Sequence, residues 1–381
     1  MSLKFMEMVA DINSRRYLRQ MQNLAISKVP CGFFCGFNIT EKLLELIQWL
    51  KNSRINLTCI VVPNDETKKV FADIAESIYT LNDIANGKAN VNYVFYENNF
   101  FYDSFTNFFR RYGMKAFPIA DLGGMESTFN FYIQHLPELY SVYEMFADEE
   151  SKAVYRAFIT GRVTGQNSDF RFAPESQYFL EGFLPSEGDI AIDGGAYDGA
   201  TSRDFTMQGA KVYAFEMSAQ NYPQCLARAQ KYNFVIENIG LSNREGTDTY
   251  KDYGVGASKG GGTETGNFID LDTYVLRKNL PRVDYIKLDI EGAELDMLHG
   301  AAKTISRWKP KMAISAYHKP EDLWTLANYV KSLRSDYEFK FRHYKIDATD
   351  YLFGNSEREI LKIFGLDYFV PSACESVLYC R

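Results

Sequence analysis

A glycine-rich turn follows a buried apolar segment in the second half of the chain. The segment Asp189–Asp193 is predicted to be a strand, and Gly194, Gly195 and Gly199 follow it before a helix. Glycines allow the backbone to approach a ligand closely and to present the amides at a helix start. The candidate ligand-binding residues here are Asp193, Gly194, Gly195, Tyr197, Gly199 and Thr201.

An acidic residue ends the next apolar segment. Glu216 follows Val212–Phe215 and lies 23 residues after Asp193. Neighbouring parallel strands end at one edge of a sheet, where an acid at this distance can accept hydrogen bonds from both hydroxyls of a ribose. The turn and the acid predict a site for a ribose-containing ligand, with Asn238 after a third strand as a candidate for the adenine edge.

Nicotinamide dinucleotides and S-adenosylmethionine both use a glycine turn followed by an acid. A dinucleotide places a pyrophosphate on the turn, where the carboxylate of Asp193 would repel it. The same carboxylate suits the cationic methionyl end of S-adenosylmethionine. The charge argument therefore favours the methyl donor.

A third group of polar residues follows two later strands. Asp289 ends a buried strand, and Glu291 and Glu294 follow at a helix start, where acids are favourable. His318 follows the next strand and is expected beside Asp289. Imidazole, with a pKa of about 6.5, is suited to accept a hydroxyl proton near neutral pH. We expect His318 to be the general base, with Asp289 and Glu291 as further catalytic residues and Asp289 also close to the donor.

Asp289, Glu291 and His318 are also ligand types for Mg²⁺. Glu291 follows Asp289 by two residues at a strand–helix junction, where the sequence does not define the side-chain directions. Magnesium is therefore an alternative that the sequence does not favour, and no metal ligand is assigned. Cys31 and Cys35 have no second Cys/His pair nearby, so a zinc site is not expected.

The sequence resembles the FkbM family of S-adenosylmethionine-dependent methyltransferases over about residues 148–344 and the last strand. Five segments carry the resemblance: Asp193–Gly199, Phe215-Glu216, Ile286–Glu294, Ser315–Trp324 and Arg342–Tyr344. Met217 departs from the family, where a proline is common. The resemblance implies a seven-stranded Rossmann-like methyltransferase sheet with an antiparallel last strand. It also implies O-methylation of hydroxyls on sugars, glycans or polyketides, with S-adenosylhomocysteine as the product.

The pattern of the whole chain predicts an α/β protein in three parts. Residues 183–381 are expected to form the methyltransferase domain, and residues 127–182 a helical connection. Residues 1–126 are expected to form a smaller, degenerate Rossmann-like αβ domain that serves as a scaffold or binds a partner or the acceptor. Strands are expected at 32–37, 57–62, 91–96, 189–193, 211–215, 234–236, 285–288, 312–315, 338–342 and 376–380. Helices are expected from Thr40 and at 129–143, 149–160, 293–306 and 321–333.

Two segments do not fit this alternation. Residues 254–266 contain six glycines and are expected to form a mobile loop or hairpin tip rather than a stable element. Residues 345–375 are longer than a hairpin requires and contain Tyr351, Phe353, Phe364, Tyr368 and Phe369. This insertion is either a lid over the acceptor or a dimer contact.

Composition excludes several classes of protein. The net charge is −7 and no cluster of Lys and Arg is present, so we expect no nucleic-acid partner. No segment approaches the about 20 apolar residues of a membrane span, and the N-terminus lacks the apolar core of an export signal. We expect a cytoplasmic enzyme that acts on a small-molecule or glycan acceptor, and a homo-oligomer is left open. Two alternatives remain: a non-catalytic cofactor-binding scaffold and an NAD-dependent nucleotide-sugar enzyme.

Overall fold

The structure is a computed structural model that describes residues 1–36, 39–97, 104–119, 122–165, 167–252, 257–347, 359–360, 362–365, 369–370 and 375–381. The chain forms two compact units that alternate along the sequence. The first consists of Met1–Leu136, Arg156–Arg171 and Lys345–Ala373, and the second of Pro137–Tyr155, Phe172–Tyr344 and Cys374–Arg381. None of the helices in the described ranges has the length and apolar character that a membrane crossing requires.

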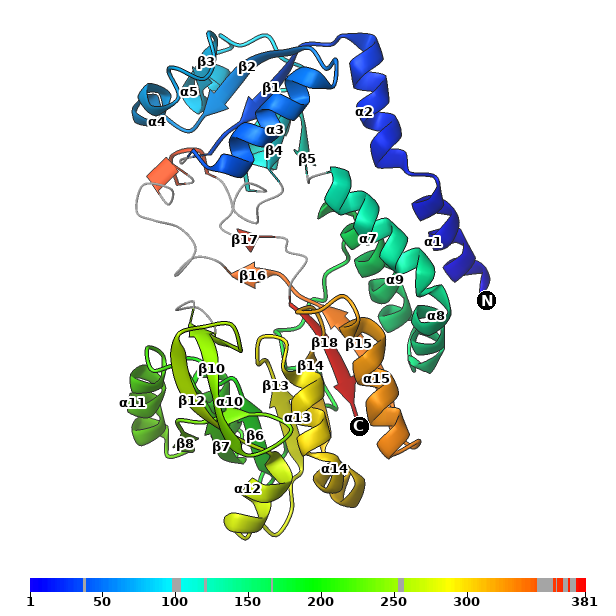
Figure 1. Cartoon of the computed structure of the whole chain (residues 1–381), viewed down its shortest axis with the longest axis vertical. Helices are drawn as coiled ribbons and strands as arrows, with labels where there is room; N and C mark the ends of the chain where they lie inside the picture. Colours follow the sequence, from blue (N-terminus) through cyan, green and yellow to red (C-terminus); the bar gives the residue numbers. More distant parts are fainter. Residues whose placement is uncertain are drawn as a thin grey trace. The chain divides into compact units, whose positions relative to one another are not determined.

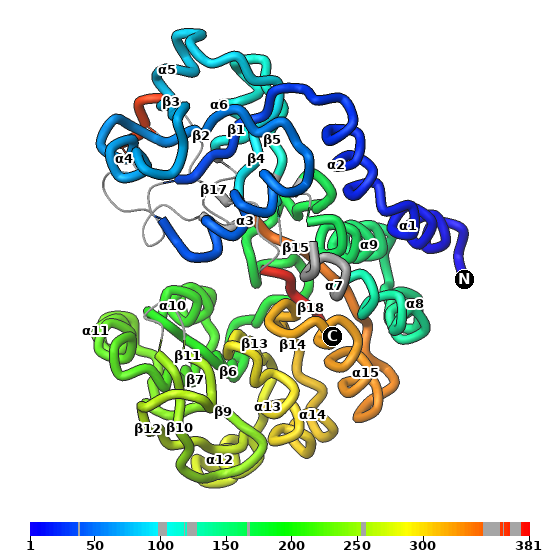
Figure 2. Tube along the Cα trace, turned by 45° about the horizontal axis from the view of Figure 1, so that its top comes forward, coloured from blue at the N-terminus to red at the C-terminus, as the bar shows by residue number. Residues whose placement is uncertain are grey.

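The first unit is built on a parallel sheet of five strands in the order β3-β2-β1-β4-β5 (Figure 1). The strands are β1 Cys31–Phe34, β2 Leu57–Val62, β3 Ile78–Thr80, β4 Tyr93–Glu97 and β5 Lys115–Ile119. The helices are α1 Leu3–Asn13, α2 Arg16–Ser27, α3 Glu41–Asn52, α4 Asp65–Val70, α5 Leu81–Ala85, α6 Ser104–Arg111 and α7 Leu122–Gln134. The trace in Figure 2 passes through α1 and α2 before it enters β1. Phe33 and Phe34 of β1 are buried in two different hydrophobic clusters, so both faces of this apolar strand are covered.

The parallel sheet predicted for the first part of the chain is confirmed. β2 has the predicted bounds, and α3 begins after Thr40, whose hydroxyl accepts a hydrogen bond from the Leu43 amide at 3.1 Å. The sequence pattern does not reveal β3 and β5, which are the two edge strands of this sheet. β3 has only three residues and β5 contains Pro118, so neither has a strong strand pattern.

The second unit is built on a sheet of seven strands in the order β15-β18-β14-β13-β6-β7-β8. These are β6 Ile190–Gly194, β7 Lys211–Phe215, β8 Val235–Glu237, β13 Tyr285–Leu288, β14 Lys311–Ser315, β15 Phe339–His343 and β18 Ser376–Cys380. β18 runs antiparallel to β14 and β15, and the other neighbours pair in parallel. The expectation of an α/β fold with parallel sheets is confirmed.

Helices pack against the seven-stranded sheet. Phe205 of α10 and Cys225 of α11 share a hydrophobic cluster with Ala191, Val212 and Tyr285 of the strands. Strand side chains alternate between the two faces of a sheet, so the residues that flank Ala191, Val212 and Tyr285 point to the opposite face. Helices α13 and α14 both contact α15 (Figure 1). The helices of this unit are α10 Ala200–Met207, α11 Tyr222–Tyr232, α12 Leu271–Arg277, α13 Glu294–Gly300, α14 Ala302–Trp308 and α15 Asp322–Leu333. Two more helices precede them in the chain, α8 Leu136–Met145 and α9 Glu149–Thr164. α9 is divided between the units, since its residues from Arg156 on belong to the first.

The helix predicted at 293–306 is two helices. α13 ends at Gly300, where a Cβ atom would lie 2.2 Å from the carbonyl oxygen of Ser242. This close backbone approach needs a glycine, and the helix is interrupted at Ala301 before α14 begins. The helical periodicity of the side chains continues through the break, which is why the sequence predicts one helix.

The prediction that residues 254–266 form no stable element is wrong in part. β11 Ala257–Lys259 and β12 Glu264–Ile269 join β9 Gly240–Leu241 and β10 Gly246–Asp252 in a four-stranded sheet, in the order β11-β10-β12-β9. Gly262 lies so close to β10 that a Cβ atom would be 1.8 Å from the carbonyl oxygen of Tyr250. That glycine therefore allows close packing between strands.

The described residues of the insertion between 345 and 370 belong to the first unit. Ile360 and Phe364 join one of its hydrophobic clusters, and the rings of Phe108 and Phe364 are 4.9 Å apart. Tyr351, Phe353 and Tyr368 lie outside the described residues. The choice between a lid and a dimer contact stays a prediction.

Candidate active site

The predicted site residues follow the carboxyl ends of neighbouring strands in the seven-stranded sheet. The last residue of β6 pairs with the last residues of β7 and β13, and β7 and β8 also end in register. Gly195, Glu216, Asn238 and Asp289 therefore emerge at the same edge. His318 follows β14, which is parallel to β13. The structure thus brings the two groups of predicted residues to one edge.

Asp193 is buried inside the sheet rather than presented as a free charge. Its Oδ1 lies 3.1 Å from Nζ of Lys287, and its Oδ2 accepts a 2.6 Å hydrogen bond from Ser202. Lys287 also donates to the carbonyl oxygen of Gly195 at 2.7 Å and lies over the ring of Tyr178. The argument that Asp193 offers its charge to the ligand is corrected, because Lys287 neutralises it.

Lys287 and Ser202 were missed as site residues by sequence reasoning. A lysine within the apolar strand β13 was the available signal, because a lysine is almost never fully buried unless it is paired. Thr201, which was predicted instead, is half-buried in the first turn of α10, next to Ser202.

The glycine turn uses its own amides to hold its shape. The amide of Gly195 donates to the carbonyl oxygen of Phe215 at 3.0 Å, and the amide of Tyr197 donates to Oε2 of Glu216 at 2.8 Å. Gly195 has a φ of 72° and Tyr197 a φ of 52°. A Cβ atom on Gly195 would lie 1.7 Å from the carbonyl oxygen of Asp289, so only glycine fits at this position.

Glu216 joins the turn to the end of β7. Its Oε1 accepts a hydrogen bond from the Ser218 amide at 2.8 Å, while Oε2 binds the turn, and the residue is only 6% exposed. Burial raises the pKa of Glu216, although these two hydrogen bonds lower it. Asn238 donates to the carbonyl oxygen of Glu216 at 2.8 Å and so supports the backbone here. A carboxylate has about four lone-pair sites, so Glu216 can still accept hydroxyl hydrogen bonds.

His318 lies among three carboxylates. Its Nδ1 is 3.0 Å from Oε1 of Glu294, and its Nε2 is 3.7 Å from Oδ1 of Asp289 and 3.6 Å from Oε2 of Glu291. Tyr317 donates a 3.0 Å hydrogen bond to Oδ1 of Asp289. Glu294, expected to be an ordinary acid at the start of a helix, is fully buried and faces His318 instead.

The surroundings of His318 disfavour it as the general base. Burial lowers the pKa of His318, but the charges of Glu294, Asp289 and Glu291 raise it more, to about 10. At neutral pH the ring therefore carries a proton on both nitrogens and cannot accept another. Burial raises the pKa of Asp289, but the charges of Lys287 and His318 outweigh it and hold that pKa below its usual value.

Further carboxylates lie close to these residues. Burial, followed by the charge of Glu294, raises the pKa of Asp322 to about 7. Burial, followed by the charge of Asp289, raises the pKa of Glu375 to about 7, although Glu375 accepts a hydrogen bond from Gln177. The edge therefore carries more negative than positive charge.

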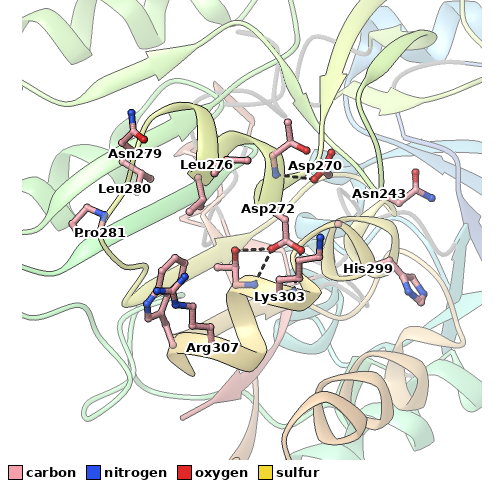
Figure 3. Close-up of a pocket in the computed structure, with 15 residues that line it drawn as sticks. Asn243, Asp270, Asp272, Leu276, Asn279, Leu280, Pro281, His299, Lys303 and Arg307 are labelled. Carbon is pink, nitrogen blue, oxygen red and sulfur yellow. Dashed lines mark hydrogen bonds between the residues drawn. The ribbon is translucent and has the colours of Figure 1, made fainter.

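A separate cavity of about 710 Å³ lies in the same unit (Figure 3). It is lined by residues of α12, α13 and α14, among them His299, Lys303 and Trp308, and by none of the predicted site residues. Its carboxylate Asp272 accepts hydrogen bonds from the amides of Lys303 and Thr304 at 2.9 and 2.8 Å. Asp272 thus holds the start of α14 in place.

Comparison with solved structures gives a match along the whole chain. The methyltransferase FkbM of Methylobacillus flagellatus KT has a TM-score of 0.61 and 18% identity, and the match covers 97% of this chain and 99% of that chain. Two further matches are a precorrin-6y C5,15-methyltransferase of Geobacter metallireducens GS-15 and an rRNA methylase of Streptococcus thermophilus. Their TM-scores are 0.32 and 0.30, with 10% and 15% identity, over 56% and 51% of this chain and 94% and 88% of theirs. The first match shows a shared fold.

A search of the curated proteins found no significant match. The family model of the methyltransferase FkbM domain matches residues 193–346, which run from Asp193 through His318 to the end of β15 and beyond. This match begins at the glycine turn and includes Glu216, which follows β7, and the carboxylates around His318. The resemblance to the FkbM family is confirmed, because the model of its methyltransferase domain matches residues 193–346.

Proposed function

We propose that this protein transfers the methyl group of S-adenosylmethionine to a hydroxyl on a sugar, a glycan or a glycosylated natural product. One observation carries the proposal: the 2.8 Å hydrogen bond from the Tyr197 amide to Glu216 joins the glycine turn and the acid into one site. The match to the methyltransferase domain supports methyl transfer as the reaction.

The residues at this edge fit the donor. Glu216 is held by two backbone amides and keeps the capacity to accept hydrogen bonds from the two ribose hydroxyls. Gly195, Tyr197 and Gly199 would bring the backbone close to the ligand, and Asn238, which follows β8, is the candidate for the adenine edge. The excess of carboxylates at the edge suits a cationic donor.

The same geometry argues against a nicotinamide dinucleotide. A pyrophosphate needs free amides in the turn. The amides of Gly195 and Ala196 both donate to the carbonyl oxygen of Phe215, and the amide of Tyr197 donates to Glu216.

Glu291 is the residue we assign to accept the hydroxyl proton. It has 36% of its side chain exposed, more than Asp289, Glu294 or His318, so an acceptor can reach it. When bound, S-adenosylmethionine supplies a methyl group attached to a positively charged sulfur. His318 offsets the negative charge of the carboxylates and orients Asp289 and Glu291 toward the acceptor side.

A mass-spectrometric assay tests the function. The protein is incubated with S-adenosylmethionine and a panel of sugars, glycans and glycosylated products, and each acceptor is examined for one added methyl group. We expect a methylated product that is absent when S-adenosylhomocysteine is added in excess. Donor binding without transfer to any member of the panel would favour the scaffold alternative, and methylation of nitrogen or carbon alone would contradict the hydroxyl as the acceptor group.

A further inference from the structure

We propose that Asp289, Glu294 and His318 bind a divalent cation of the Mn²⁺ type, with Glu291 at the open side of the site. One ligand atom of each of the three residues lies within 4.8 Å of the others. A six-coordinate cation with ligands at about 2.1 Å separates them by roughly 3–4.2 Å. Small side-chain rotations therefore suffice to close the cluster around a cation.

Three buried atoms of this cluster lack a hydrogen-bond partner within the part of the chain that the structure describes. They are Oε2 of Glu294 and both ring nitrogens of His318. Glu294 is fully buried, and only 9% of the His318 side chain is exposed. A buried polar atom without a partner costs about 1–3 kcal/mol. A cation bound to Oε2 of Glu294 and to one ring nitrogen of His318 would displace the proton from that nitrogen and give both atoms a partner.

The distances around Nε2 fit a shared cation better than direct hydrogen bonds. Nε2 of His318 is 3.7 Å from Oδ1 of Asp289 and 3.6 Å from Oε2 of Glu291. Both separations are too long for a hydrogen bond. Both fall in the range that separates two ligands of one divalent cation.

Neighbouring groups hold the ligands in place. Tyr317 donates to Oδ1 of Asp289 at 3.0 Å, and the amide of Ile290 donates to Oε1 of Glu294 at 2.9 Å. Such outer contacts are typical of metal sites because they fix the orientation of the ligands. The sequence did not favour a metal because it does not define side-chain directions after β13, and the structure supplies them.

The ligand types indicate the class of cation. Two carboxylates and one imidazole are a mixed oxygen and nitrogen set, which Mn²⁺ accepts more readily than Mg²⁺, whose ligands are mostly oxygens. The excess of negatively charged carboxylates at this edge favours the binding of a doubly charged cation. A role for the cation in activating the acceptor hydroxyl rests on the proposed function, but cation binding itself does not.

Titration with Mn²⁺ tests the site in the full chain without donor or acceptor, with free Mn²⁺ measured by electron paramagnetic resonance. We expect one Mn²⁺ per chain. Glu294→Gln, which keeps an oxygen to accept the Ile290 amide, is expected to weaken binding at least about tenfold, as is His318→Ala. Glu264→Gln, an exposed residue of β12, is the matched control and is expected to bind Mn²⁺ like the unmodified chain.

Absence of binding at millimolar Mn²⁺, or equal affinity in all of these proteins, would overturn the proposal and leave His318 as an ion-pair partner only. Thermal unfolding shows whether each variant folds. For the unmodified protein, anomalous scattering from crystals soaked in Mn²⁺ gives a second measurement, with a peak expected between Asp289 and Glu294. Because no donor is present, failure here leaves the proposed methyl transfer untouched, and failure to bind donor leaves this site untouched.

Discussion

Glu216 is the single side chain on which donor binding is expected to depend most. Glu216→Ala removes the acceptor of the ribose hydroxyls and also releases the amides of Tyr197 and Ser218. Hydrogen bonds to charged groups contribute about 1.5–3 kcal/mol, so affinity for S-adenosylhomocysteine should fall at least about tenfold. Calorimetric titration measures the change. Glu245→Ala, which removes an exposed ion pair with Arg277, serves as control, and unchanged affinity in Glu216→Ala would place the ribose elsewhere.

Glu291 is expected to matter for turnover rather than for donor binding. Glu291→Gln keeps the size of the side chain but removes the proton acceptor, so kcat should fall by about 10²–10⁴. Affinity for S-adenosylmethionine should stay the same. The rate of methyl transfer to the acceptor found by mass spectrometry measures this, with Glu264→Gln as control. Retention of most of the turnover would exclude Glu291 as the base.

The sequence identified the types of the site residues better than their roles. It placed Asp193, Glu216, Asp289 and His318 at one edge, because acids and a histidine after strand ends are local signals. It did not indicate that Lys287 neutralises Asp193 or that His318 lies among carboxylates, since these contacts join residues that follow or belong to different elements. Charge balance in a buried site depends on such contacts, and they appear only in three dimensions.

At the scale of elements, the close approach of the glycine turn to β13 can be tested directly. Gly195→Ala would put a Cβ atom 1.7 Å from the carbonyl oxygen of Asp289, in addition to the cost of a positive φ. We expect a loss of roughly 2 kcal/mol or more in the free energy of unfolding, together with weaker donor binding. Gly188→Ala is the matched control, because Gly188 also has a positive φ but no atom within 4 Å of the added Cβ. Equal losses in urea unfolding for the two variants would show that the close approach does not matter.

Asp148 links the start of α9 to β15. It accepts hydrogen bonds from the amide of Ser151 at 2.5 Å and from Arg342 at 3.1 Å. Burial raises the pKa of Asp148, but the hydrogen bonds from Arg342 and Ser151 have the larger, opposite effect and lower it to about 2. Because the pKa is lower in the folded state, the stabilisation is present at neutral pH and is lost as the pH falls from about 4 through about 2.

Asp148→Asn tests this link, because asparagine still caps a helix but carries no charge. The variant should be roughly 1 kcal/mol less stable than the unmodified protein at pH 7, because solvent screens this partly exposed charge, and the difference should vanish below about pH 2. Urea unfolding at several pH values measures it. A difference that does not depend on pH would mean that the charge of Asp148 contributes nothing. Glu245→Gln, at a fully exposed pair, should change little at any pH.

Elements with a continuous pattern were predicted well, and breaks in the pattern were not. β2, β7, β13 and β18 have the predicted bounds because apolar runs of strand length are local features. The break between α13 and α14 follows from the approach of Gly300 to Ser242, which no neighbouring residue signals. The short edge strands β3 and β5 likewise depend on the strands beside them.

For the whole molecule, the alternation of the two units along the chain has no local signal. Ile360 and Phe364 lie more than two hundred residues from Phe108 in sequence, yet they share a hydrophobic cluster with it. The sequence predicts domains as consecutive stretches of the chain. An apolar pattern shows that a segment is buried, but it does not show which other segment packs against it. The α/β class can be predicted from the sequence, because the alternation of strands and helices is visible along the chain.

Calorimetric titration of the unmodified protein tests the central claim most directly, because the claim is that the second unit holds S-adenosylmethionine. S-adenosylmethionine, S-adenosylhomocysteine and NAD are titrated in separate experiments under the same conditions. We predict binding of one S-adenosylmethionine or one S-adenosylhomocysteine per chain and no binding of NAD. Binding of NAD together with no binding of either methyl-donor compound would contradict the account.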